Sequence, residues 1–329
     1  MCPRPGLHRP VRLDPAGVRG PTRADVRAGR WVGVWRGWFV PSDVDRACPE
    51  QRVLEASVLL PARGPSALTG WAGLRWQGAR WIDGVGRGGV PDDVALVTRG
   101  RDVRPRPGIE LSQERLTPTE VQVVDGVPIT SATRSVCFVL RHARDERAAV
   151  VLADMALAAG LCALDDVAAH LDTLARWPGV PLARARLPLL ADGSASPGET
   201  RMRLVWELDA GLPRPLLNAP IFDRSGRHVA TVDLLDPVAG LVGEYDGADH
   251  LRVGRRRRDL RRESDLRALG LEYVTMVGGD DHRRAATAAR ILAAHRRARS
   301  EPVAMRSWTL EQPDWWRRRH GRPVTPGRS

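Results

Sequence analysis

The sequence predicts a mixed α/β protein built from more than one domain. Its 329 residues exceed the roughly 100 to 200 that one domain usually contains. Apolar residues make up 43% of the chain and charged residues 27%, which is the balance of a protein that folds around a core. Apolar positions recur with the period of strands in some segments and of helices in others. We therefore expect strands and helices to be mixed along the chain.

The N-terminal half is expected to hold a small unit and a larger mixed region. Residues 1–20 are rich in Pro, Gly and Arg without periodicity, which predicts a disordered lead. Residues 21–45 predict a short helix and an aromatic hairpin, which form either a winged-helix-like unit or simply a packed hairpin. Residues 46–186 mix short strands with helices. The Pro, Ser and Gly of residues 187–198 indicate a linker.

Residues 199–300 predict a second domain with the element order α-β-β-β-α-β-α. The helices and strands are expected, in order, in the segments SPGETRMRLVWELDAGL, LLNAPIF, HVATVDLL, GLVGEYD, RRRRDLRRESDLRALG, LEYVTMV and DHRRAATAARILAAHRRA. Leu204, Val205 and Leu208 should share one face of the opening helix. Residues 301–329 contain Pro breaks and three tryptophans, and they predict a basic appendage.

Positive charge is concentrated at the C-terminal end. The net charge is +12, and every cation is an arginine. Residues 251–329 hold 20 arginines and nine acidic residues, whereas the first 250 residues hold 31 and 30. Such a segment suits a polyanion such as DNA, because neutralised phosphates release counterions. A solvated arginine-rich helix and tail would have the same composition.

Neither a disulfide framework nor a membrane segment is predicted. The four cysteines form no CxxC pair and have no His partner at zinc-finger spacing. The N-terminus lacks the apolar stretch of a secretory signal, so we expect a cytoplasmic protein. The most apolar stretch, Ala148 to Leu164, is too short to span a membrane and contains Asp154, so we expect a buried helix and no membrane partner.

Two carboxylates are expected to face each other in the second domain. Asp233 lies in its second strand and Glu244 in its third, and the connecting turn is centred midway between them. Opposed residues of antiparallel strands have Cβ atoms about 4.5 to 5.5 Å apart, so two like charges there repel each other unless a cation lies between them. Mg²⁺ or Mn²⁺ is the natural candidate, since both prefer oxygen ligands. Two exposed polar residues at the end of a hairpin are the alternative.

Glu199 has two interpretations. It follows Ser196 by three residues, which is the spacing of a capping box at the start of a helix. A carboxylate near a helix start can also face a neighbouring site, so capping and a place beside the metal do not exclude each other.

The same motifs resemble a known superfamily. SPGETRMRLVWELDAGLPRP, VDL, GEYDGADH, RRRRDLRRESDLRALG and LEYVTMV look like the PD-(D/E)XK nucleases, in the branch similar to very-short-patch repair endonucleases. The resemblance covers about a hundred residues and implies a restriction-endonuclease-like core. Upstream, PTRADVRAGRWVGVWRGWFVP, VDGVPITSATRSVCFVL and ADMALAAGL resemble the AbiEi-type antitoxin region, whose N-terminal winged helix is implicated in DNA binding.

The nuclease resemblance assigns roles to individual residues. Asp233 and Glu244 would bind the metal, with Glu199 as a third carboxylate and the Tyr245 carbonyl completing the shell. Asp246 stands where many superfamily members have a lysine, although the near relatives share E-x-D-G. It would orient water or accept a proton, or it is simply a turn residue.

The residues after this motif would act on the nucleic acid. His250 would relay a proton, or it is an ordinary loop histidine. The charged helix would hold the DNA backbone, with Arg258 and Arg262 four residues apart on one face, unless its arginines are merely solvated. The arginines in question are Arg255, Arg258 and Arg262. Asp259 fits the aspartate of the same family helix and would be an ion-pair partner.

Three functions are compatible with these sequence features. The first is a Mg²⁺- or Mn²⁺-dependent DNA endonuclease, a hydrolase of phosphodiester bonds. The second is a non-catalytic DNA-binding regulator or type IV antitoxin-like protein, to which a partner protein or toxin would belong. The third is an interaction module built around the tryptophan-bearing tail.

Overall fold

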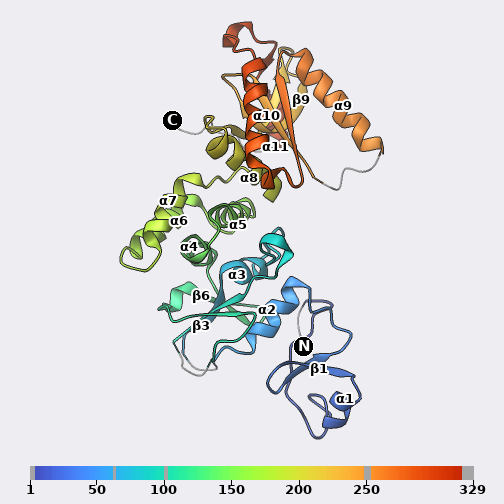
Figure 1. Ribbon diagram of the computed structural model, residues 1–329, viewed down its shortest axis with the longest axis vertical. Coiled ribbons are helices and arrows are strands. Elements are labelled where there is room, and N and C mark those ends of the chain that lie inside the picture. Colours follow the sequence, from blue (N-terminus) through green and yellow to red (C-terminus); the bar gives the residue numbers. More distant parts are fainter. Residues whose placement is uncertain (1–3, 62–63, 100–102, 248–252, 321–329) are drawn as a thin grey trace. The chain divides into compact units, whose positions relative to one another are not determined.

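The computed structural model describes residues 4–61, 64–99, 103–247 and 253–320, with the side chains of residues 87 and 253–259 excepted. The chain divides into two compact units, Met1–Leu190 and Ala191–Ser329, shown in Figure 1. Both units combine sheets with helices, so the predicted mixed α/β class is confirmed. Within the described residues, no helix combines the length and the apolar content that a membrane crossing requires.

The first unit begins with a short helix and a hairpin. Helix α1 (Arg23–Arg27) is capped by Thr22, and strands β1 (Trp31–Trp35) and β2 (Trp38–Pro41) pair in an antiparallel two-stranded sheet. Residues 4–20, expected as a disordered lead, contact this unit: Val11 and Phe39 exchange backbone hydrogen bonds of 2.9 Å. Residues 4–20 form no helix or strand of their own and are held by isolated contacts, which agrees with their lack of periodicity.

A five-stranded sheet forms the centre of the first unit. Its spatial order is β5-β4-β3-β7-β6. The strands are β3 (Ser66–Thr69), β4 (Val94–Thr98), β5 (Ile109–Ser112), β6 (Val121–Val124) and β7 (Val127–Thr130). Strands β6 and β7 are joined by Asp125 and Gly126, both with positive φ, as a two-residue hairpin turn requires. The larger helices of this unit are α2 (Pro49–Ser57), α3 (Gly70–Trp76), α4 (Ala132–His142), α5 (Glu146–Ala158), α6 (Leu164–Thr173) and α7 (Val180–Arg186).

The second unit is a mixed sheet of spatial order β11-β10-β9-β8-β12 with helices around it (Figure 1). Strands β10 and β11 are parallel, and the other neighbours are antiparallel. The strands are β8 (Leu216–Asp223), β9 (His228–Asp236), β10 (Leu241–Asp246), β11 (Glu272–Val277) and β12 (Trp308–Thr309). The helices are α8 (Pro197–Leu204), α9 (Val253–Ala268), α10 (Arg284–Arg297) and α11 (Asp314–His320).

Each face of this sheet has its own core. On one face, side chains of α8 and α10 pack with Leu234, Leu241 and Met276 of the strands. On the other face, Leu266 of α9 and Trp308 of β12 pack with strand residues. Both helix layers therefore bury apolar area, which is the main favourable contribution to folding.

The opening helix differs from its predicted pattern. After α8 the chain continues as a π-helix over Val205–Asp209, which shifts the side chains relative to a regular α-helix. As a result Trp206 is fully buried, whereas Leu208 is 42% exposed. The expectation that Leu208 shares a core face with Leu204 and Val205 is therefore wrong.

Part of the tail belongs to the sheet. In β12, Trp308 pairs with Asp223 and Thr309 with Phe222 of β8, and the Trp308 ring is buried. Arg224 donates hydrogen bonds to the carbonyls of Val303 and Arg306, both at 2.7 Å. The part of the expected appendage from residue 303 to residue 309 is thus held against β8 and the turn that follows it.

Candidate functional site

The β9–β10 hairpin has the predicted register. Leu241 pairs with Asp236, Val242 with Leu235 and Gly243 with Leu234. The turn is held by Asp236, whose Oδ1 accepts hydrogen bonds from the backbone of Val238 and Ala239. One step beyond these pairs, the same register sets Asp233 opposite Glu244.

Backbone hydrogen bonding fixes Asp233 beside this position. Its Oδ2 accepts a hydrogen bond of 2.8 Å from the backbone N–H of Tyr245, the residue after Glu244. Both carboxylates also affect the ionisation of a neighbouring side chain, Tyr273. Burial raises the pKa of Tyr273, and the negative charges of Glu244 and Asp233 add to that rise. The structure therefore brings the two predicted carboxylates together.

The strand pair β8–β9 is irregular next to Asp233. The pairs Leu217–Leu234 and Ala219–Val232, on either side of Asn218 and Asp233, share one register, and the register shift of this strand pair lies between Ile221 and Phe222. Asn218 has a φ of 46°, in the left-handed region. Leu234 packs on the α8 side of the sheet and Val232 on the α9 side. Residues two positions apart in a regular strand point to the same face, so the side-chain alternation of β9 is interrupted at Asp233. Local irregularities of this kind are frequent next to functional sites, where they redirect a side chain.

Arg262 supplies a cation to this site. Its Nη2 lies 2.5 Å from Glu244 Oε1 and also donates to the carbonyl of Thr231. The Glu244 side chain is 11% exposed and that of Arg262 is 34% exposed, so this ion pair is partly shielded from water. Arg262, predicted to contact the DNA backbone, thus forms an ion pair with one of the two predicted metal ligands.

The backbone and the carboxylate of Glu199 are both hydrogen-bonded at the start of α8. Its backbone N–H donates to Ser196 Oγ at 3.2 Å, so Ser196 caps α8 as predicted, but the carboxylate accepts from the N–H of Ala195 and not from that of Ser196, as a capping box would require. Its own Oε2 accepts hydrogen bonds from the Ala195 backbone at 2.8 Å and from Asn218 Nδ2 at 2.9 Å. No group of three or more His, Cys, Asp or Glu side chains is arranged for a metal ion anywhere in the described residues. Glu199 thus takes part in the helix cap and does not complete a cluster with Asp233 and Glu244.

The remaining predicted residues are only partly described. Asp246 is the exposed last residue of β10 and pairs with Val277 of β11. His250 lies outside the described residues. Arg255, Arg258 and Asp259 belong to α9, but their side chains are also outside the described part of the chain.

Tyr273 and Asn218 were not predicted to belong to the site. Tyr273 lies in β11 near Glu244, Arg262 and Asp233, which all affect its ionisation. Asn218 Nδ2 donates to Glu199 Oε2 and to the Gly193 carbonyl. In the register of the flanking pairs, Asn218 falls level with Asp233. A polar amide inside the apolar segment LLNAPIF was the available signal for Asn218. Tyr273 gave none, because an aromatic residue in a strand is ordinary.

Gly198 explains how the SPGE and EYD motifs depend on each other. A Cβ atom on Gly198 would lie 2.1 Å from the ring of Tyr245. The backbone of Tyr245 in turn donates to Asp233, so the close approach of α8 fixes the strand that carries the site.

We expect Gly198→Ala to destabilise the second unit by about 1 to 3 kcal/mol, because a well-packed ring has no room for an added methyl group. Urea unfolding would measure this loss. Gly278→Ala is the matched control, since its added Cβ would lie 3.8 Å from the same tyrosine, an ordinary contact. Equal stability of the two variants would contradict the proposed packing.

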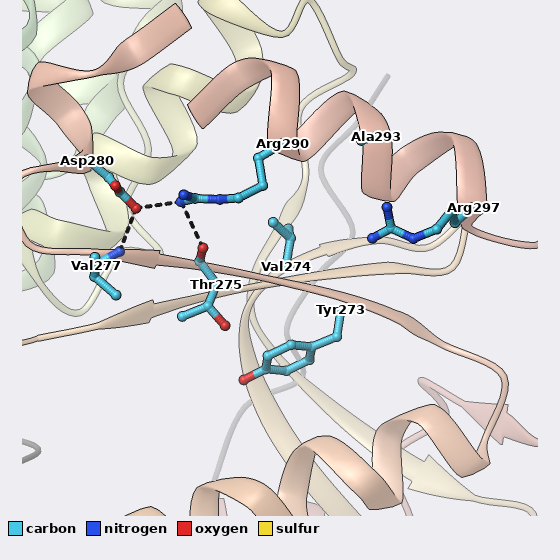
Figure 2. Close-up of a pocket in the computed structure, with 8 residues that line it drawn as sticks. All are labelled: Tyr273, Val274, Thr275, Val277, Asp280, Arg290, Ala293 and Arg297. Atoms are coloured by element: carbon cyan, nitrogen blue, oxygen red, sulfur yellow. Dashed lines mark hydrogen bonds and ion pairs between the residues drawn. The ribbon is translucent and has the colours of Figure 1, made fainter. Parts of the chain in front are cut away.

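A separate hollow of about 400 Å³ lies between β11 and α10 (Figure 2). Arg290 reaches from α10 to the Thr275 carbonyl and to Asp280. Figure 2 shows the Tyr273 ring on the opposite side of β11 from Arg290 and Arg297. Asp233 and Glu244 do not line this hollow.

Comparison of the chain with protein-family models, curated proteins and solved structures gives no significant match. The chemistry of the site therefore rests on its residues. Two carboxylates on adjacent strands fit a divalent cation, because Mg²⁺ is usually held by one or two carboxylates together with water and substrate phosphates.

Proposed function

We propose that this protein is a metal-dependent DNA endonuclease. The observation that carries the proposal is the proximity of Asp233 and Glu244. They lie level with each other in the register of the β9–β10 hairpin, and Asp233 Oδ2 accepts a hydrogen bond from the N–H of Tyr245, the residue after Glu244. The order of helices and strands in the second unit, with β10 parallel to β11, supports a PD-(D/E)XK-type core. The arginine excess in this unit supports a nucleic-acid substrate.

Asp233 and Glu244 would hold Mg²⁺ or Mn²⁺. The metal would lower the pKa of a bound water and stabilise negative charge on the phosphate. The N–H of Tyr245 orients the Asp233 carboxylate, and the buried position of Glu244 limits access of bulk water. Asp233 and Glu244 thus offer carboxylate oxygens that are held in position and partly shielded from water.

Arg262 would contribute the cation that a lysine provides in other PD-(D/E)XK nucleases. Asp246 occupies the lysine position of the motif and carries the wrong charge for that role. The Arg262 guanidinium already lies 2.5 Å from Glu244, close to where a phosphate would meet the carboxylate pair. A guanidinium also matches the geometry of phosphate oxygens.

A DNA-binding regulator is the second candidate. It is favoured by the same ion pair, because Arg262 compensates the charge of Glu244 without any metal. In such a protein the carboxylates would stabilise the fold, and the arginines alone would bind DNA. Regulators of this kind bind DNA without cutting it.

Nicking of supercoiled plasmid tests the proposal. We expect the purified protein to nick DNA with Mg²⁺ or Mn²⁺, to stop with a chelator, and to lose this activity in Glu244→Gln. Activity that survives in Glu244→Gln would point to a contaminating nuclease. Wild-type protein that shifts DNA in a gel and never nicks it would favour the regulator.

A further inference from the structure

Helix α11 carries a cluster of exposed cations at the edge of the second unit. Its last turn consists of Arg317, Arg318, Arg319 and His320, all exposed. Arg317 pairs with Asp314 at the start of the same helix, and both side chains remain more than half exposed. Cations at the C-terminal end of a helix are favoured by the helix dipole.

Aromatic packing fixes this helix to the sheet. Trp316 lies edge-on to Phe222 of β8, with ring centroids 5.2 Å apart, and its ring is 4.5 Å from that of His228 in β9. The His320 ring stacks on the Trp316 ring, with the two centroids 3.8 Å apart. Trp315 Nε1 donates to the Gly226 carbonyl at 3.2 Å. The arginines are therefore presented from a fixed base.

The cluster is connected to the candidate site through β9. His228 Nε2 lies 3.0 Å from Thr231 Oγ1, and the Thr231 carbonyl accepts from Arg262, which pairs with Glu244. Burial lowers the pKa of His228, and the charges of His320 and Arg262 act in the same direction, which agrees with this proximity. Asp233 lies five positions after His228 in β9, or about 17 Å along the strand.

We propose that the arginines of α11 form a second DNA-backbone contact that extends the nuclease site. This inference deepens the proposed function by naming where the flanking duplex is held. One strand of DNA carries a phosphate every ~3.4 Å along its axis, so α11 would contact phosphates about five nucleotides from the scissile one. The contact is with phosphates and independent of base sequence.

The packing of α11 favours DNA over an anionic membrane. A helix that binds a membrane surface inserts its apolar face between lipids. The Trp316 ring, however, already packs against Phe222 and His228, and the guanidinium groups face outward. Trp315 of α11 is 42% exposed, but its Nε1 donates to the Gly226 carbonyl, which holds this ring at the sheet. Planar, permanently charged guanidiniums suit the phosphate oxygens of a duplex.

Binding of a 25-base-pair duplex at several salt concentrations, without divalent metal, tests the inference. We expect the triple variant R317Q/R318Q/R319Q to bind at least about tenfold more weakly at 100 mM salt, and its salt dependence to be shallower by about two to three in log–log slope. R144Q/R176Q/R184Q removes the same charge from exposed arginines of the first unit and should bind within about twofold of wild type. Arg184 pairs with an exposed Asp172, as Arg317 does with Asp314, so the two triples are matched.

A further variant separates position from charge. Trp316→Ala keeps every arginine but removes the anchor of α11, so we expect it to weaken binding about as much as the triple variant does. Circular dichroism would confirm that each variant is folded. Equal binding by the two triples would overturn the inference, as would loss of binding to anionic vesicles in the α11 triple with DNA binding intact. Because binding is measured without metal, failure of the nuclease proposal would appear separately, in the nicking assay.

Discussion

Asp233→Asn is expected to lower metal-dependent nicking about 10³-fold while leaving DNA affinity unchanged or slightly higher. Asparagine keeps an oxygen that can accept the Tyr245 N–H, so the hairpin should stay folded. It lacks the negative charge that a divalent cation requires, and the loss corresponds to about 4 kcal/mol of transition-state stabilisation. Nicking rates at saturating protein and a gel-shift titration would measure the two quantities.

Asp265→Asn is the matched control for this substitution. Asp265 is exposed on α9, so the variant has the same change of net charge in the same unit. We expect it to nick at the wild-type rate. An Asp233→Asn variant that nicks as fast as Asp265→Asn would remove Asp233 from the site.

Glu114→Gln is expected to destabilise the first unit by about 3 to 5 kcal/mol. Arg134 and Arg141 of α4 have fully buried side chains and both pair with Glu114, at 2.7 Å for Arg141. His142 Nε2 also lies 2.8 Å from this carboxylate. Removing one member of a buried charge cluster leaves its partners without a compensating charge, and this lowers the free energy of unfolding strongly. Chemical denaturation would measure the loss, with Glu146→Gln, an exposed glutamate of the same unit, as control.

The same cluster predicts how stability depends on pH. Burial opposes ionisation of Glu114, but hydrogen bonds from His142 and Arg134 and the nearby arginine charges lower its pKa from 4.5 to about 2. The unfolded chain therefore takes up this proton first, and the stabilisation present above pH ~4.5 is lost as pH falls towards 2. Wild-type stability should fall more steeply over this interval than that of Glu114→Gln. Parallel curves would contradict the assigned pairing.

Local signals in the sequence predicted the hairpin and the helix cap well. The position of Asp233 opposite Glu244 follows from the centre of one short turn, and Ser196 caps α8 because a hydroxyl at that spacing satisfies a helix N–H. Both features depend on residues close together in the chain. The spacing of residues in the sequence is informative over such short distances.

Features that depend on distant residues were not predictable in this way. The reach of Arg262 to Glu244 is set by how α9 packs on the sheet, which no spacing in the sequence expresses. The π-helix after α8 places Leu208 outside the core. This was not predictable, because the apolar period of a sequence does not distinguish a π-helical turn from an α-helical one. Strand β12 has two residues, too few for any alternation to be visible.

Nicking of supercoiled plasmid by the wild-type protein, followed over a range of Mg²⁺ and Mn²⁺ concentrations, tests the central claim most directly. Conversion of supercoiled to open-circular DNA that requires the metal and is absent in Asp233→Asn is the result we predict. Wild-type protein that binds double-stranded, single-stranded and mismatched DNA but cuts none of them with either metal would contradict the endonuclease assignment.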